Sequence, residues 1–370
     1  MTTTIHDAEV FTVGTDDAVI TFATDDDREI TTVVGERAVT TRGPRHFVAI
    51  DGLQPATTYP VQVDGAAPTE LLPATITTLT PPPGRRLTTF TTVNDVHFGE
   101  TVCGLLGLPE ELGPIFRSDE GEEPYPEVMN RGVIEAMDAI APDAVLVKGD
   151  LTDAGTEEEY AAFLRAYGHF GARLHHIRGN HDAMTTDALA AHGPFAVELP
   201  GVVLAVLDTV RPGTDKGRLP VEQIDWLDAL ARDAATPVLV FGHHQPWDPA
   251  SEDRNPDYFG INPDDSEALC RVVAARDAIG GVFAGHTHRT RLRRFPAARD
   301  VPIVEVACVK DYPGAWARYD VHEGGYVQTV RRAARADAFA WAEQTRQMFA
   351  GLYAEYARGG LADRCFVQLW

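Results

Sequence analysis

The stretch Val145-Leu146-Val147-Lys148-Gly149-Asp150, which continues as Leu151-Thr152-Asp153, decides the fold of this chain. An apolar run of this length predicts a buried strand, and Asp150 follows the strand directly. Open α/β sheets place their chemistry at the carboxyl ends of their strands. Alone, the pattern indicates little more than a turn, because Gly and Asp are common turn residues. Its meaning comes from similar blocks elsewhere in the chain.

Four other polar blocks follow short apolar runs of their own. They are Asp95-Val96-His97, Gly179-Asn180-His181-Asp182, Gly242-His243-His244 and Gly285-His286-Thr287-His288. With Asp150, these blocks offer carboxylate, carboxamide and imidazole groups but no thiolate. Such a set suits hard-to-borderline divalent metal ions, and it is large enough for two ions that share one carboxylate.

Length and composition limit the function classes. At 370 residues the chain can form two or three domains with a full core. The net charge of −23 disfavours binding of a nucleic acid polymer, because phosphate neutralisation needs a basic surface. No stretch predicts a membrane span, and the first twenty residues lack the basic and apolar regions of a secretory signal. We therefore expect a cytoplasmic protein with a small substrate and four reduced, scattered cysteines.

Residues 1–84 predict a separate all-β sandwich domain. Short β-branched or aromatic runs separated by Asp, Gly and Pro occupy residues 10–13, 18–24, 29–34, 38–41, 46–50, 59–63 and 74–79. The segment Leu53-Gln54-Pro55-Ala56-Thr57-Thr58-Tyr59 looks like the tyrosine turn of fibronectin type III domains, in which the tyrosine hydroxyl bonds to upstream backbone. Pro81-Pro82-Pro83-Gly84 is a stiff linker, and we place the domain boundary there.

Residues 85–330 alternate between strand and helix patterns and predict an α/β domain. Helices are expected at 127–140, 156–170, 219–234 and 264–279, and strands at 87–93, 144–148, 173–177, 202–207, 237–241 and 281–284. Thr156 is the expected N-cap of its helix, with Glu159 as its capping-box partner. Three antiparallel strands at 303–309, 315–321 and 326–330 are expected to end the domain. Residues 100–126 form an insertion, either a solvated loop or a lid.

Residues 331–370 predict a helical C-terminal extension. An apolar stripe at helical spacing runs from Ala338 to Tyr356 and ends at Gly359-Gly360. We expect this stripe to pack against a domain or a second subunit, with a membrane anchor as the less favoured alternative. A homo-oligomer through the N-terminal domain or this helix is consistent with the pattern.

The order of the five blocks resembles the calcineurin-like metallophosphoesterases, whose pattern is Asp-x-His, Gly-Asp, Gly-Asn-His-(Asp/Glu), Gly-His and Gly-His-x-His. The resemblance covers roughly residues 87–330. It implies a four-layer α/β/β/α sandwich of two mixed sheets, which binds two divalent ions, Mn, Fe or Zn. Carried over by motif, one ion would bind Asp95, His97, Asp150 and His288, and the other would bind Asp150, Asn180, His243 and His286. The implied reaction is attack on phosphorus by a hydroxide held between the two ions.

The resemblance also implies roles for two residues beside the ligands. In the family, the histidine of Gly-Asn-His binds no metal and faces the leaving group, so we expect His181 to stabilise the transition state and to donate a proton. Asp153 matches a carboxylate that pairs with this histidine, which would fix its tautomer and raise its pKa. The alternatives are a plain hydrogen-bonding role for His181 and a turn role for Asp153.

Neighbouring polar residues are given supporting roles. We expect His244 to lie behind the ligand His243, and Asn94 to support the ligands of the first ion. A solvated edge, with contact to a substrate phosphate as the alternative, is expected for Lys148, Lys310, Arg289, Arg291, Arg293 and Arg294.

Two differences from purple acid phosphatases narrow the choice among classes of phosphoesterase. Purple acid phosphatases carry a tyrosine where this chain has Asp153, and they lack the histidine that is His97 here. The motifs look more like bacterial class III cyclic-nucleotide phosphodiesterases, to which Leu207-Asp208-Thr209 and the doubled His243-His244 are similar. We therefore expect a phosphodiesterase for small phosphodiesters such as 3′,5′-cyclic nucleotides. A phosphomonoesterase or nucleotidase with the same metals is the second hypothesis, and a non-catalytic scaffold is the third.

Overall fold

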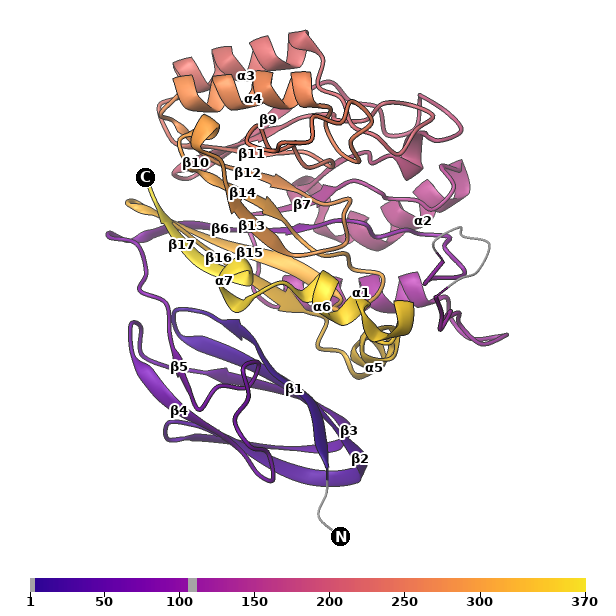
Figure 1. The fold of residues 1–370 in the computed structure, drawn as a ribbon, viewed down its shortest axis with the longest axis vertical. Helices are drawn as coiled ribbons and strands as arrows, with labels where there is room; N and C mark the ends of the chain where they lie inside the picture. Colours follow the sequence, from indigo (N-terminus) through magenta and orange to yellow (C-terminus); the bar gives the residue numbers. More distant parts are fainter. Residues whose placement is uncertain (1–3, 106–111) are drawn as a thin grey trace.

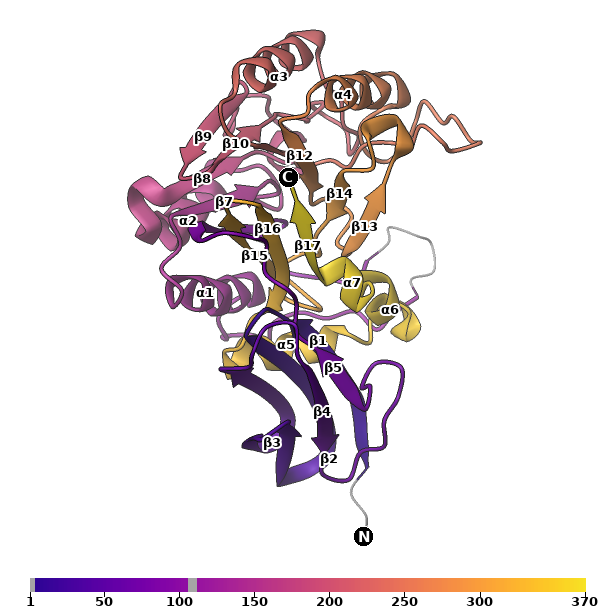
Figure 2. The same ribbon diagram turned by 90° about the vertical axis from the view of Figure 1, so that its left-hand side faces the viewer.

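The computed structural model describes residues 4–105 and 112–370. An N-terminal β region, a layered α/β unit and a C-terminal extension follow one another along the chain (Figure 1). In both views the C-terminal helices lie between the β region and the α/β unit (Figure 2). Residues 106–111 of the predicted insertion lie outside the described residues.

The N-terminal region is an antiparallel sheet of five strands, whereas the sequence predicted seven. The strands are β1 (Ile5–Val13), β2 (Asp17–Val34), β3 (Arg37–Asp51), β4 (Thr58–Val63) and β5 (Thr75–Thr77). The prediction was wrong because Asp25-Asp26-Asp27 and Gly43-Pro44 looked like turns. In the structure, β2 continues through the three aspartates and β3 continues through Gly43-Pro44. The pairing of β2 with β3 shifts register between Ala23 and Arg28. The Tyr59 hydroxyl accepts a hydrogen bond from the Gln54 N–H at 2.8 Å.

The α/β unit contains two six-stranded mixed sheets. The first has the order β17-β16-β15-β6-β7-β8, in which β6, β7 and β8 are parallel. Its bounds are β6 (Arg86–Val93), β7 (Ala144–Lys148), β8 (Leu174–Ile177), β15 (Ala315–His322), β16 (Gly325–Arg332) and β17 (Cys365–Leu369). The end of the chain therefore docks as an edge strand of this sheet.

The second sheet has the order β13-β14-β12-β11-β10-β9. Its bounds are β9 (Phe195–Leu199), β10 (Val202–Val206), β11 (Val238–Phe241), β12 (Ile279–Ala284), β13 (Arg291–Arg294) and β14 (Pro302–Glu305). The sequence grouped the strand after residue 302 with the two antiparallel strands that follow it, which was wrong, because β14 belongs to this sheet, parallel to β12 and antiparallel to β13. Strands β9 and β13 were missed. Both are edge strands whose side chains are only half-buried or exposed, so their apolar signal is weak.

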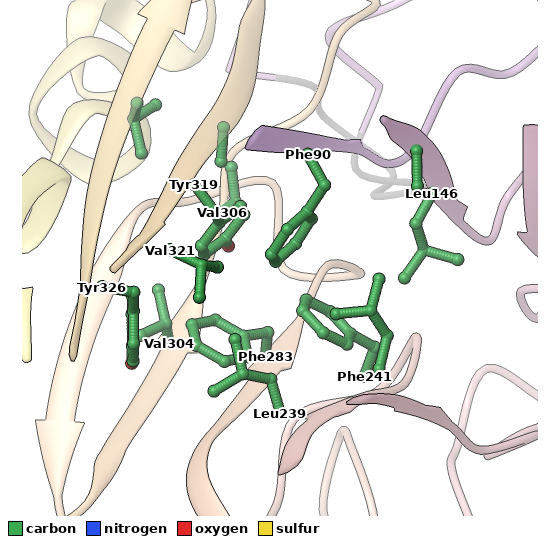
Figure 3. Packing of buried hydrophobic residues seen from close by; sticks show 14 of the residues in the cluster. Phe90, Leu146, Leu239, Phe241, Phe283, Val304, Val306, Tyr319, Val321 and Tyr326 are labelled. Carbon is green, nitrogen blue, oxygen red and sulfur yellow. The ribbon is translucent and has the colours of Figure 1, made fainter. Parts of the chain in front are cut away.

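The two sheets pack face to face over an aromatic core (Figure 3). Phe90 of β6 meets Phe241 of β11 edge to face with ring centroids 5.9 Å apart, and Tyr319 of β15 meets Phe283 of β12 edge to face at 5.3 Å. Each buried aromatic pair of this kind stabilises the fold by about 0.5–1.5 kcal/mol, in addition to the contribution of its buried area. They hold the two sheets in a fixed position, and this position sets where their strand ends meet.

Four helices cover the outer faces of the two sheets. They are α1 (Tyr125–Asp138), α2 (Glu157–Tyr167), α3 (Val221–Asp233) and α4 (Pro263–Ala275). Helices α1 and α2 pack on β7, while α3 and α4 pack on β10 and β11, which gives the predicted four-layer α/β/β/α arrangement. The capping box predicted for Thr156 and Glu159 is present at the start of α2.

The C-terminal extension is helical but broken. Its helices are α5 (Ala336–Thr345), α6 (Tyr353–Arg358) and α7 (Leu361–Arg364), and a 3-10 turn at Phe349–Gly351 interrupts the predicted stripe. Ala338 and Ala342 on α5 are buried in the core beneath α1, so this half of the stripe packs within the chain. The second half does not continue that face, because Phe349 and Ala350 take left-handed backbone conformations.

A buried charged cluster joins the three parts of the chain. The Glu9 carboxylate on β1 lies 3.6 Å from the Arg332 guanidinium on β16 and 3.5 Å from that of Arg346. Arg358 on α6 lies 3.4 Å from its other oxygen. Burial opposes ionisation of Glu9, but Arg346 and Arg332 outweigh it and hold the pKa of this carboxyl below its usual value. One carboxylate therefore contacts several buried cations.

Candidate metal centre

The predicted ligands stand at the carboxyl ends of strands from both sheets. Asp95 follows β6, Asp150 follows β7 and Asn180 follows β8 in the first sheet, while His243 follows β11 and the pair His286 and His288 follows β12 in the second. Parallel strands bring their carboxyl ends to one edge, and the sheets face each other, so residues almost two hundred positions apart meet.

Asp150 lies at the middle of the cluster. One of its carboxylate oxygens lies 3.6 Å from His97 Nε2 and 3.3 Å from His243 Nε2. Its other oxygen accepts a hydrogen bond from the backbone N–H of His181 at 2.9 Å. This carboxylate can therefore reach ligands of both predicted ions.

The remaining predicted ligands complete the two groups. Asp95 lies 3.4 Å from His288 Nε2, and Asp95, His97 and His288 present their ligand atoms to one another. On the other side, the Asn180 side-chain oxygen lies 3.1 Å from His243 Nε2. His286 presents its ligand atom toward that of His243. The structure thus brings all seven side chains together.

Glycines allow this close approach. A Cβ at Gly149 would lie 2.5 Å from His243 Nδ1, and a Cβ at Gly179 would lie 2.2 Å from an Asp150 oxygen. Gly149 also has a φ of +94°, which disfavours any side chain. Glycine is therefore required before Asp150 and before Asn180, because a side chain at either position would collide with a ligand from another block.

The donor set fits metal ions. Buried atoms without a hydrogen-bond partner include Asp95 Oδ1, both ring nitrogens of His97 and His286 Nε2. Unpartnered buried polar atoms are costly and call for an ion or another compensating group. Left-handed backbone conformations, also costly for non-glycine residues, occur at Asp95, His97, Asp150, His286 and His288. Strain and unpaired polar atoms that gather at one point indicate a functional site.

Protonation also favours metal binding. Burial lowers the pKa of His97 and of His286 well below the usual value, so both imidazoles are neutral and their lone pairs are available. His243 differs: burial opposes its protonation, but the Asp150 carboxylate outweighs this and raises its pKa to about 9. Its Nδ1–H donates to the Lys148 carbonyl at 2.8 Å, which turns Nε2 toward Asp150. A divalent cation would take the place of the Nε2 proton.

His181 lies beside the cluster and donates its Nδ1–H to the Asp153 backbone carbonyl at 2.7 Å. The Asp153 carboxylate, the partner implied by the family, is farther away, 3.7 Å from the same nitrogen and also 3.7 Å from His97 Nδ1. Burial opposes protonation of His181, but the Asp150 carboxylate and the Asp153 carbonyl outweigh it and raise its pKa. This environment favours an imidazolium that can give up a proton at Nε2.

Sequence reasoning gave no role to Asp182, which joins two of the ligand loops. It is fully buried and accepts hydrogen bonds from the N–H groups of Leu151, Thr152 and Gly179, and from the Thr152 hydroxyl, at 2.6–3.0 Å. Burial and the nearby Asp150 raise the pKa of Asp182 to about 6, against the effect of these donors. The residue was visible as the last position of Gly-Asn-His-Asp, but its contacts depend on the fold.

The expectation of a solvated edge was wrong for several cations. Lys148 is fully buried and donates to the Ala284 carbonyl at 2.7 Å, and Lys310 is buried in an ion pair of 2.6 Å with Glu100. Arg289 and Arg293 both pair with the buried Glu305, at 2.9 and 3.2 Å. These cations contact carbonyl and carboxylate groups within the protein. The spacing of the residues in the sequence did not indicate these contacts.

The supporting residues behave in two ways. His244 is buried behind the ligand group and exchanges hydrogen bonds with the Thr209 hydroxyl, at 2.9 Å to its ring and 3.0 Å from its N–H. The Asn94 amide donates to Asp95 and to the Val306 carbonyl. Asn94 therefore orients a ligand directly, and His244 lies close enough to His243 and His286 to count as a further candidate ligand.

A cleft of about 580 Å³ opens onto these residues. It is lined by Leu105, Asp150, Asn180, His181, Asp215, Phe259, His286, Thr287, His288, Phe349, Leu352, Tyr353 and Tyr356. Its size is in the range of small-molecule sites. The described lining contains two aspartates and no lysine or arginine.

Comparison with known proteins agrees with this geometry. A family model described as calcineurin-like phosphoesterase matches residues 88–290, more than half of the chain. This chain belongs to the calcineurin-like phosphoesterase family. The family predicted from the five blocks is therefore confirmed. Membership also supports the expectation of a metal-dependent phosphoester hydrolase, since members of this family bind two divalent ions.

Curated relatives are similar over part of their length. A probable cyclic nucleotide phosphodiesterase of Synechococcus sp. is 28% identical over 40% of this chain and 59% of its own. The glycerophosphodiester phosphodiesterase GpdQ of Enterobacter lignolyticus is 28% identical over 42% and 60%. A cAMP/cGMP dual specificity phosphodiesterase of Mycobacterium tuberculosis is 32% identical over 40% and 49%. The chain thus spans about half to three-fifths of the length of these relatives.

Among solved structures, a dimetal phosphatase from Danio rerio is similar with a TM-score of 0.50 and 15% identity, over 68% of this chain and 98% of that one. That likeness shows the fold alone. None of the helices in residues 4–105 and 112–370 combines the length and apolar content that a bilayer crossing requires.

Proposed function

We propose that this protein is a metal-dependent phosphodiesterase that hydrolyses small phosphodiesters. The observation that carries the proposal is the cleft itself, which is lined by His181 and by four of the seven candidate ligands but has no lysine or arginine in its described lining. A phosphomonoester carries a second negative charge that such a cleft would leave unpaired, whereas a phosphodiester carries one. Family membership and the names of the relatives support the same class.

We propose Asp95, His97, Asp150 and His288 as ligands of one ion, and Asp150, Asn180, His243 and His286 as ligands of the other. Two such ions, when bound, supply a water of lowered pKa and neutralise charge on the phosphoryl oxygens. Their identity stays open among Mn, Fe and Zn, because carboxylate, carboxamide and imidazole ligands suit all three.

The chain's own residues contribute positioning and proton transfer. The Asp150 carboxylate fixes the loop of His181 by accepting a hydrogen bond from the His181 backbone N–H. The backbone carbonyl of Asp153 orients the His181 ring by accepting a hydrogen bond from Nδ1–H. His181 borders the cleft, and its raised pKa keeps a proton ready for the departing oxygen. The buried walls around the ligands keep bulk water from the charged groups.

The proposal is tested with the metal-loaded protein and two substrates that share one leaving group. Bis-p-nitrophenyl phosphate should be hydrolysed with a higher kcat/KM than p-nitrophenyl phosphate. A clear preference for the monoester would replace this proposal by the phosphomonoesterase hypothesis. No turnover of either substrate, with no bound transition metal after Mn²⁺ addition, would leave the non-catalytic scaffold.

Four further assignments stay proposals. We place domain boundaries at residues 84 and 330, with residues 331–370 as the C-terminal extension. The hydrogen bond from Gln54 to Tyr59 supports kinship of residues 1–84 with fibronectin type III domains. Free thiols at all four cysteines are consistent with a cytoplasmic location. A homo-oligomer stays a prediction that measurement of the solution mass would test.

A further inference from the structure

Exposed apolar side chains gather at the cleft. Among the described residues, twelve large hydrophobic side chains are exposed, and four of them line this one cleft: Leu105, Phe259, Leu352 and Tyr356. Leu352 is 65% exposed and Tyr356 is 46% exposed. Scattered exposed apolar residues need no explanation, but a group of them beside candidate catalytic residues indicates a binding surface.

Much of this surface comes from outside the family match. The matched region ends at residue 290, whereas Phe349, Leu352, Tyr353 and Tyr356 belong to the C-terminal extension. We call the segment 349–356 the cleft wall. Phe349, Leu352, Tyr353 and Tyr356 of the apolar stripe therefore border the candidate metal ligands, while Met348 is buried against Tyr125 and Tyr312.

Hydrogen bonds fasten the cleft wall to the loop of His286 and His288 and to the loop that holds Asp311. The Tyr353 hydroxyl donates to Asp311 at 2.7 Å, and the Tyr356 hydroxyl donates to the backbone carbonyl of Thr287, between two candidate ligands, at 2.8 Å. Next to the wall, the Trp341 indole N–H donates to the Lys310 carbonyl at 3.0 Å. These bonds make the wall a fixed part of the site and not a loose tail.

The backbone that presents the wall is strained. Phe349 and Ala350 have φ values of +54° and +57°, in the left-handed region that non-glycine residues avoid. The Ala350 N–H donates to the Gly113 carbonyl of the insertion at 2.7 Å, which holds the turn. Such strain persists where surrounding contacts enforce it. Here the turn ends the α5 face and directs the next side chains to the cleft.

We propose that the cleft wall is the specificity element of this enzyme and binds a flat, uncharged ring attached to the phosphoester. The inference rests on the proposed phosphoesterase function and adds a substrate class to it. Aromatic and leucine side chains bind ring faces by apolar contact, and the described lining offers no cation for a second anionic group. A small polar ester group such as glycerol would leave this wall uncovered, so aryl or nucleoside esters are favoured over glycerol esters.

The test measures binding and does not depend on turnover. Dissociation constants of phenylphosphonate and methylphosphonate for the metal-loaded full-length protein share the phosphonate contribution, so their ratio reports the ring. The wild type should prefer phenylphosphonate. Leu352→Ser should lower this preference about 5-fold, the effect of removing roughly one isobutyl contact with the ring. Leu352→Met should restore most of it.

Val221→Ser is the matched control, because Val221 is 63% exposed on α3 and is not in the cleft lining. A second ligand pair, adenosine 5′-monophosphate and ribose 5-phosphate, identifies the ring. A preference that Leu352→Ser lowers in this pair supports a nucleobase, and one confined to the phosphonates supports a smaller aryl group. Equal constants in both pairs, or an effect shared by Val221→Ser, would overturn the inference. Absence of phosphoester hydrolysis would overturn the proposed function, even if the ring preference held.

Discussion

Replacement of the buried Asp182 by Asn tests whether this carboxylate holds the ligand loops together. One of its oxygens accepts from Leu151 N and Gly179 N, at 3.0 and 2.7 Å, and the other accepts from Thr152 N and the Thr152 hydroxyl, at 2.8 and 2.6 Å. An amide has one accepting oxygen. In Asp182→Asn, the more favourable orientation of the amide leaves its oxygen accepting from the N–H groups of Leu151 and Gly179. The NH₂ group then faces the Thr152 N–H, which is also a donor.

At least one buried donor then loses its partner, which costs about 1–3 kcal/mol of the free energy of unfolding. The melting temperature should fall by at least about 2 °C. Because the bonds join the Asp150 loop to the Asn180 loop, metal affinity should also drop about 10–100-fold, as measured by titration with Mn²⁺.

Asp277→Asn is the matched control, because the Asp277 side chain is 99% exposed. It should change neither the melting temperature nor the metal affinity. If Asp182→Asn melts with the wild type and binds metal equally well, the carboxylate does not hold the loops and the reasoning is wrong.

Three other substitutions probe the site and the fold. Asp150→Ala should abolish turnover and leave less than two metals per chain by elemental analysis, because this carboxylate reaches both ligand groups. His181→Ala should keep both metals and slow hydrolysis about 10²–10⁴-fold, most for esters with poor leaving groups. Glu9→Gln should lower the free energy of unfolding by about 1–3 kcal/mol in urea denaturation, because it removes a carboxylate that Arg332 and Arg346 share with Glu343. Since the folded pKa of Glu9 lies below 4.5, its stabilisation is complete above pH 4.5 and disappears as the pH falls through the folded value.

Each of these predictions has a contrary result. Two metals retained by Asp150→Ala would remove the shared-ligand assignment. If His181→Ala hydrolyses every substrate at the wild-type rate, whatever its leaving group, His181 does not donate the proton. Equal urea midpoints for Glu9→Gln and wild type at pH 7 would show that Glu343 is a sufficient anion for Arg332 and Arg346 and that Glu9 adds nothing to stability.

The local sequence pattern predicted an element correctly where the residues of that element alone indicate its type. The apolar runs before Asp95, Asp150 and His243 predicted β6, β7 and β11, and the Thr156 capping box predicted the start of α2. Such signals depend on neighbours within a few residues. Pattern failed where the partner is distant: Asp25–Asp27 looked like a turn, yet pairing with β3 keeps β2 extended. The strand after residue 302 lies parallel to β12 because of the sheet it joins.

The sequence by itself determined the family, the order of the ligand-bearing blocks and the residue types at the candidate metal centre, because these are written in short contiguous motifs. Only the tertiary structure decided which cations are buried, that the Asp153 carbonyl and not its carboxylate contacts His181, and that the C-terminal extension lines the cleft. Motifs specify which side chains are present, whereas distance, burial and hydrogen bonding depend on how elements far apart in the chain pack.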